Sequence, residues 1–169
     1  RNTLNFIAPE TVTFQRTVAV AWCSYSHIIQ LRSWLPDEVG GVCWMSVDNP
    51  AQTPRVPIFC GTTALPKAYD VCGQKQLDNN CVLWTYRKAN KLATVAWQST
   101  RPILESALKS YEDDAFTGLK DLEQKVVDNG NAKKSAKILN AYTSDNFEKS
   151  AKKWKQLEEM FWLRFGMGF

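Results

Sequence analysis

The spacing of apolar residues changes at Pro66, and this change limits the chain to folds that keep strands and helices apart. Before Pro66, short runs rich in β-branched and aromatic residues alternate with turn signals. After it, apolar residues recur at the three-to-four spacing of a helix that packs on one side. Strands followed by helices are typical of an α+β fold. We therefore predict a single α+β unit, with residues 1–66 rich in strands and residues 67–169 rich in helices.

The strand-rich part contains about four candidate strands. They are residues 17–24, 27–34, 41–48 and 55–61. Pro36-Asp37 and Gly40-Gly41 separate the second run from the third, and both pairs favour turns. Short connections between successive strands predict an antiparallel sheet, and Pro57 indicates an edge or a bulge in the last strand.

The helix-rich part contains three or four candidate helices. They are residues 82–97, 101–129, 132–142 and 146–165. Pro102 suits the first turn of the second helix, and Gly130 suits its end. Asp145 and Glu148 have the spacing of a capping box, which predicts that the last helix starts there. The apolar stripes of these helices are expected to pack against the sheet.

The charge pattern does not favour nucleic acid as a partner. The formal net charge is +4, and residues 1–66 hold equal numbers of acidic and basic side chains, so the excess lies in residues 67–169. There the acids are interleaved with the bases, as in Glu148 and Lys149, whereas a nucleic-acid surface concentrates its bases. No apolar run approaches the roughly 20 residues that cross a bilayer, so no membrane partner is predicted.

The cysteines do not form a metal-binding pattern. They are Cys23, Cys43, Cys60, Cys72 and Cys81. No C-x-x-C pair is present, and His27 is the one histidine, so neither a metal site nor a cofactor is predicted. His27 shares its strand face with Ile29 and Leu31, which favours a structural role. Cys72 and Cys81 flank a polar loop and are compatible with a disulfide or with free thiols, which leaves the compartment open.

Arg32 is the most informative polar side chain. It lies two residues after Gln30 in the predicted strand 27–34, so both side chains share one face. A guanidinium among apolar neighbours needs anionic or carbonyl partners, because an unpaired buried charge is costly. Two partners stay open: a peptide carboxylate in a substrate cleft, or a salt bridge with Asp37 or Glu38 at the adjoining turn.

Three segments together resemble a known hydrolase family. They are SHIIQLRSWLPDEVGGVCWM (26–45), DNPAQTPRVPIFCGTTALPKAYD (48–70) and LWTYRKANKLA (83–93). They resemble the cysteine dipeptidases of the N-terminal-nucleophile class, the dipeptidase A type that is related to the secernins. The resemblance spans about residues 16–100.

The resemblance implies a four-layer αββα hydrolase that cleaves short peptides. In that family the nucleophile is a cysteine at the first position after processing, and its own α-amino group serves as the base. None of the cysteines in this chain is N-terminal. We therefore expect residues 1–169 to be the C-terminal part of a larger enzyme, inactive alone and without a catalytic residue of its own. Ser26, Gln30 and Arg32 are expected to line the substrate cleft.

Two other functions stay open at this stage. The first is a related amidase that hydrolyses acyl-amino acids on the same scaffold. The second is a non-catalytic protein-interaction domain. If the chain is one part of an enzyme, its sheet should expose an apolar face, and the isolated chain should then self-associate because it lacks its N-terminal partner segment. Any signal peptide would lie upstream of Arg1, so the sequence leaves the localisation and the preferred dipeptide open.

Overall fold

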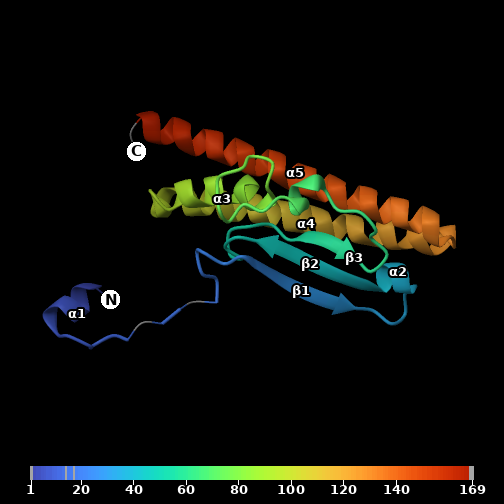
Figure 1. Cartoon of the computed structure of the whole chain (residues 1–169), viewed down its shortest axis with the longest axis horizontal. Helices are drawn as coiled ribbons and strands as arrows, with labels where there is room; N and C mark the ends of the chain where they lie inside the picture. Colours follow the sequence, from blue (N-terminus) through green and yellow to red (C-terminus); the bar gives the residue numbers. More distant parts are fainter. Residues whose placement is uncertain (1, 14, 17, 168–169) are drawn as a thin grey trace.

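The computed structural model describes residues 2–13, 15–16 and 18–167 and confirms the α+β class (Figure 1). The elements in chain order are α1 (Asn2–Ile7), β1 (Tyr25–Leu31), α2 (Asp37–Gly40), β2 (Gly41–Val47), β3 (Val56–Phe59), the 3-10 helix η1 (Lys67–Asp70), α3 (Val82–Ala93), α4 (Trp97–Asn129) and α5 (Ala132–Met167).

The sheet is antiparallel, as predicted, and its strand order is β1-β2-β3. In the register, Ile28 of β1 pairs with Trp44 of β2, and Cys43 of β2 pairs with Ile58 of β3. Because side chains alternate along a strand, Trp44 and Cys43 point to opposite faces. Trp44 is buried beneath the helices, whereas Cys43 is only half-buried on the outer face.

The expected strand over residues 17–24 is wrong, so the described residues form three strands where about four were predicted. Residue 17 lies outside the described residues, and residues 18–24 form bends and a turn. Val18 is 99% exposed, and the backbone N–H of Cys23 donates to the carbonyl of Val20 at 3.2 Å. Side chains that favour strands do not form one without a neighbouring strand to bond with.

The helices differ from the prediction at their boundaries. The expected helices 132–142 and 146–165 are one continuous helix, α5, so Asp145 and Glu148 do not start a helix. The chain stays helical there because Thr143 is fully buried and its Oγ1 donates to the carbonyl of Pro57 at 2.9 Å. The first predicted helix, 82–97, ends earlier, at Ala93, and α4 already begins at Trp97.

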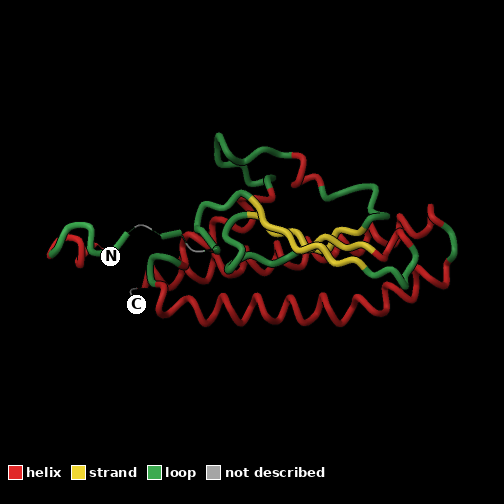
Figure 2. Tube along the Cα trace, turned by 90° about the horizontal axis from the view of Figure 1, so that it is seen from below, coloured by secondary structure: helices red, strands yellow, loops and turns green. Residues whose placement is uncertain are grey.

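The two long helices run back along each other and cover one side of the sheet (Figures 1 and 2). They are joined at Gly130, whose φ of 56° is the left-handed conformation that glycine adopts without strain. One apolar cluster lies between the sheet and α4, and includes Val42, Phe59 and Leu122. A second cluster lies where α3, α4 and α5 meet, around fully buried Trp154. None of the described helices is long and apolar enough to cross a membrane.

The opposite side of the sheet is largely uncovered. The segment that carries η1 passes beside the β3 end of the sheet, where Tyr69 packs against Phe147 of α5 with 5.6 Å between the ring centroids. At the β1 end, the outer face exposes 61% of Ile29 and 76% of Leu31. His27 lies between Tyr25 and Ile29 on this same face, as the sequence predicted. The sheet therefore buries the inner face of β2 and β3, leaves Ile28 of β1 half exposed, and presents an apolar outer face at β1.

Candidate functional site

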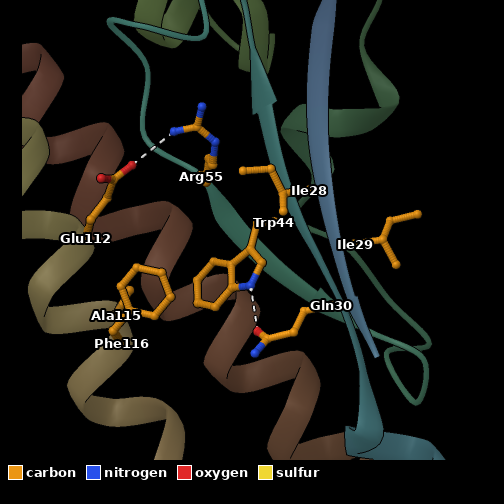
Figure 3. Close-up of a pocket in the computed structure, with 8 residues that line it drawn as sticks. All are labelled: Ile28, Ile29, Gln30, Trp44, Arg55, Glu112, Ala115 and Phe116. Carbon is orange, nitrogen blue, oxygen red and sulfur yellow. Dashed lines mark hydrogen bonds and ion pairs between the residues drawn. The ribbon is translucent and has the colours of Figure 1, made fainter. Parts of the chain in front are cut away.

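A cavity of about 300 Å³ lies between the sheet and α4 (Figure 3). It lies beside β1, one of the two edge strands. Its lining residues come from β1, β2, the approach to β3, and α4. They are Ile28, Ile29, Gln30, Trp44, Arg55, Glu112, Ala115 and Phe116.

The strand register places an amide beside an indole in this cavity. Ile28 and Gln30 lie two residues apart on β1, so their side chains share one face. They pair with Trp44 and Val42 of β2, which point toward the helices. The indole Nε1 of Trp44 donates to Oε1 of Gln30 at 3.3 Å. The Trp44 ring packs on Phe116 of α4 with 4.7 Å between the ring centroids. The floor of the cavity is therefore aromatic, and one amide group stands at its side.

An ion pair forms the other wall. Arg55 Nη1 lies 3.1 Å from Oε1 of Glu112, and Nη2 donates to the carbonyl of Pro50 at 3.2 Å. The Nε atom of Arg55 is buried and has no hydrogen-bond partner among the described residues. The Arg55 side chain as a whole is 25% exposed, and a guanidinium on a cavity wall is suited to a carboxylate or carbonyl group of a bound molecule.

Ser26 lies on the same face of β1 as Gln30 but outside the cavity. It pairs with Ser46 across the strands, and the Ser46 hydroxyl donates to the carbonyl of Thr53 at 3.3 Å. The Ser26 Oγ atom is buried and lacks a partner among the described residues. Of the residues predicted to line a cleft, Gln30 alone therefore reaches this cavity.

Arg32 follows the end of β1 and turns away from the cavity into the protein. Its side chain is 6% exposed and forms an ion pair with Glu123 of α4. Its Nη2 donates to the carbonyl of Val39 at 2.7 Å, and burial lowers the pKa of the guanidinium from its usual value. The salt bridge with Asp37 or Glu38 is thus not formed, because Glu123 is the partner. The place of Arg32 in a substrate cleft stays a prediction.

Sequence reasoning missed a buried polar cluster centred on Asp48. Asp48 is fully buried with a φ of 66°, and its Oδ1 accepts a hydrogen bond from Arg87 Nε at 2.7 Å. Its Oδ2 accepts from Nδ2 of Asn90 at 3.0 Å. The same Nδ2 reaches Thr53 Oγ1 at 2.8 Å, and Trp154 Nε1 donates to Asn90 Oδ1 at 2.9 Å.

The signal for this cluster was an amide on an apolar helical stripe. Asn90 follows Leu83 and Tyr86 on the predicted helix 82–97, where an apolar residue would continue the pattern. A buried amide needs partners for both its oxygen and its nitrogen. The cluster ties the end of β2 to α3 and α5, and all of its central groups are satisfied, so its evident role is structural.

The thiols differ in exposure: Cys60 and Cys72 are exposed, Cys23 and Cys43 are half-buried, and Cys81 is buried. All five cysteines are free, so Cys72 and Cys81 do not form a disulfide here. Cys81 is 1% exposed, and its Sγ donates to the carbonyl of Val71 at 3.0 Å. Burial raises the pKa of the Cys43 thiol, which disfavours the nucleophilic thiolate. Within the described residues, no cluster of three His, Cys, Asp or Glu side chains is placed to hold a metal ion.

Comparison with known proteins places these observations in a family. The model of peptidase family C69 matches residues 5–110, which is more than half of the chain. The matched range includes the whole sheet, the Asp48 cluster apart from Trp154, and most of the cavity. A search of curated proteins found no match.

Proposed function

The chain belongs to peptidase family C69, a family of cysteine dipeptidases, and on this premise we propose that it forms the part of a dipeptidase that does not carry the nucleophile. The family match is the observation that carries the proposal. In the proposed reaction, a thiolate attacks the carbonyl carbon of the peptide bond, the amine leaves with a proton, and water then releases the acyl group. The thiolate would come from a cysteine at the amino end of a segment outside these 169 residues.

The thiol environments support this division of roles. Cys43 has a raised pKa, and Cys81 is buried against a backbone carbonyl. Cys23 also donates to a carbonyl, that of Tyr25, at 3.1 Å. A cysteine nucleophile instead needs an adjacent base or a lowered pKa. These three cysteines therefore serve better as small packing residues than as nucleophiles.

The outer face of the sheet supports the same proposal. A sheet that buries one face and exposes Ile29 and Leu31 on the other presents apolar area that a second layer would cover. A second sheet on this face would complete the four-layer αββα arrangement. We assign that sheet to the rest of the enzyme.

The cavity is proposed as a substrate subsite that holds one residue of a dipeptide. Trp44 and Phe116 provide an apolar floor, Gln30 can hydrogen-bond a peptide group, and Arg55 can bind the free carboxylate of a dipeptide. A related amidase would use the same aromatic floor for an acyl chain. The two activities differ in whether the substrate has a free α-amino group.

The test compares the complete enzyme with the isolated chain. We expect the complete protein to hydrolyse unmodified dipeptides and to lose this activity after thiol alkylation. The 169-residue chain alone should show no hydrolysis. Preferential cleavage of N-acyl amino acids by the complete protein would establish the amidase alternative instead.

A control separates the nucleophile from the rest of the proposal. The complete protein with Cys23, Cys43, Cys60, Cys72 and Cys81 all replaced by serine should keep its activity if it remains folded. Near-ultraviolet circular dichroism establishes the folding. Activity that is lost in a folded variant of this kind, or hydrolysis by the isolated chain, would overturn the proposed division of roles.

A further inference from the structure

The strand β1 has one bonded edge and one free edge. It pairs with β2, and no other described segment pairs with it. The N–H of Asp48 donates to the carbonyl of Ser24 at 3.2 Å, and the N–H of Arg32 donates to the carbonyl of Gly40 at 2.9 Å. Because antiparallel bonding alternates along a strand, the even-numbered residues of β1 face β2. The backbone groups of the odd-numbered residues, from Tyr25 to Leu31, therefore point outward from the sheet.

This free edge lacks the features that usually block strand addition. Exposed edges are protected by lysine, proline, bulges or a covering segment. The sequence of β1 is YSHIIQL, with no proline and no lysine. Ile28 and Ile29 are 56% and 61% exposed, so the edge is apolar on both faces.

We propose that β1 pairs in antiparallel fashion with β1 of a second copy, with the two-fold axis at Ile28. The two three-stranded sheets then become one continuous sheet. Such an interface is isologous, because the same strand meets itself. Self-association through the exposed outer face is a separate expectation of the proposed function, and the tests below distinguish that stacking from pairing along the β1 edge.

The backbone geometry selects this register. With the axis at Ile28, Tyr25 lies opposite Leu31 of the partner copy, and His27 lies opposite Ile29. Each of these pairs joins outward-facing backbone groups from both strands, so their N–H and C=O groups bond to each other; the Tyr25 carbonyl, which also accepts from Cys23 Sγ at 3.1 Å, has a second lone pair for this bond. A two-fold axis between two residues would pair odd-numbered with even-numbered residues. Outward-facing backbone groups of one copy would then lie opposite groups of the other copy that already bond to β2. An axis at His27 or Ile29 would leave part of the strand unpaired.

The side chains fit the same register. On the helix side, Ile28 meets its own copy, and Ser26 lies opposite Gln30 of the partner copy. The Ser26 hydroxyl is buried without a partner among the described residues of the single chain. The Gln30 amide of the second copy supplies a donor and an acceptor on that side. The pairing thus joins apolar with apolar and polar with polar residues on this face.

The first experiment measures the mass of the 169-residue chain by sedimentation equilibrium over a range of concentrations. The wild type should be a dimer. Ile29→Pro removes an outward N–H without touching the bonds to β2, and should weaken dimerisation by at least about tenfold. Ile29→Lys is a second variant, which keeps the backbone N–H and adds a charge at the edge. Val95→Lys, at a side chain 71% exposed and away from β1, is the matched control and should remain dimeric.

A second experiment tests the register. In a background with Cys60 and Cys72 replaced by serine, Ile28→Cys should form a disulfide between copies, because non-hydrogen-bonded partners lie about 4.5 Å apart at their Cα atoms. Ile29→Cys should cross-link far less, because it faces His27. A monomeric wild type would overturn the proposal. So would a dimer that persists in both Ile29 variants, or an Ile28→Cys dimer that never forms the disulfide, which would indicate stacking through the outer face.

Discussion

The guanidinium of Arg32 forms an ion pair with the carboxylate of Glu123, which lies 91 residues further along the chain. Arg32 follows the last residue of β1, and Glu123 lies in the second half of α4. The pair therefore fixes the end of the edge strand β1 to a helix that covers the sheet. Backbone acceptors from the turn that contains α2 complete the shell around the guanidinium.

Removing the carboxylate of this pair should destabilise the fold. We expect Glu123→Ala to lower the free energy of unfolding by about 2–3 kcal/mol, because it leaves a buried guanidinium with carbonyl partners only. The matched control is Glu105→Ala, also in α4, whose ion pair with Arg101 is exposed and worth less than about 0.5 kcal/mol. Urea unfolding of the two variants measures the difference. Equal losses would show that the buried pair contributes no more than a surface pair.

The sequence predicted those parts of the fold that depend on local signals. The strand–turn–strand between residues 27 and 48 was predicted because its turn residues, Pro36-Asp37 and Gly40-Gly41, lie beside the strands they connect. The residues around 17–24 have a strand-like composition but find no strand partner in the described structure. Strand pairing depends on distant segments, so composition alone could not reveal that outcome.

Contacts between residues far apart in the sequence determined the features that were not predicted. Asp145 and Glu148 fit a capping box, but Thr143 just before them is held against Pro57 of β3, and the helix continues through. Gln30 and Arg32 were predicted to share one face of their strand, and both side chains lie on the helix side, because alternation along a strand is local. The ion-pair partner of Arg32 was not predicted, because Glu123 is distant in the sequence and lies on another element. The cavity also depends on how α4 packs against the sheet, and the sequence pattern does not reveal that packing.

The Asp48 cluster should depend strongly on Asn90. Asn90→Ala removes the partners of Asp48 Oδ2, Thr53 Oγ1 and Trp154 Nε1 together. Each buried group left unsatisfied costs about 1–3 kcal/mol, so we expect a loss of at least about 3 kcal/mol in the free energy of unfolding. The matched control is Asn140→Ala in α5, whose hydrogen bonds are exposed, with an expected loss of about 1 kcal/mol. Similar losses, measured by urea unfolding, would contradict a structural role for the cluster.

Stability should fall at alkaline pH because of buried phenols. Burial raises the pKa of Tyr86 and of Tyr111 above the usual 10.0. The folded protein therefore holds these protons more tightly than the unfolded chain does. Their contribution to stability is complete below about pH 10 and is lost as the pH rises toward the folded pKa values, by up to about 1.4 kcal/mol per pH unit for each phenol.

Tyr86→Phe tests this alkaline effect directly. Tyr86 shares a 2.7 Å hydrogen bond with Ser150, and Ser150 still donates to the carbonyl of Phe147 when the phenol is removed. The variant should therefore show a shallower loss of stability between pH 9 and about 11.5 than the wild type. Guanidinium unfolding at several pH values measures both slopes. Parallel slopes would assign the alkaline loss to other groups.

The proposed subsite predicts separate effects for its two polar walls in the complete enzyme. Arg55→Ala should raise the KM for dipeptides by about tenfold, because a charge-assisted bond to the substrate carboxylate is worth roughly 1.5 kcal/mol or more. Dipeptide amides, which lack that carboxylate, should lose little. Gln30→Ala should raise the KM for both kinds of substrate, and Gln98→Ala on the exposed surface of α4 should change neither. An Arg55 variant with equal losses for dipeptides and their amides would show that the guanidinium supports the fold through Glu112 and does not contact the substrate.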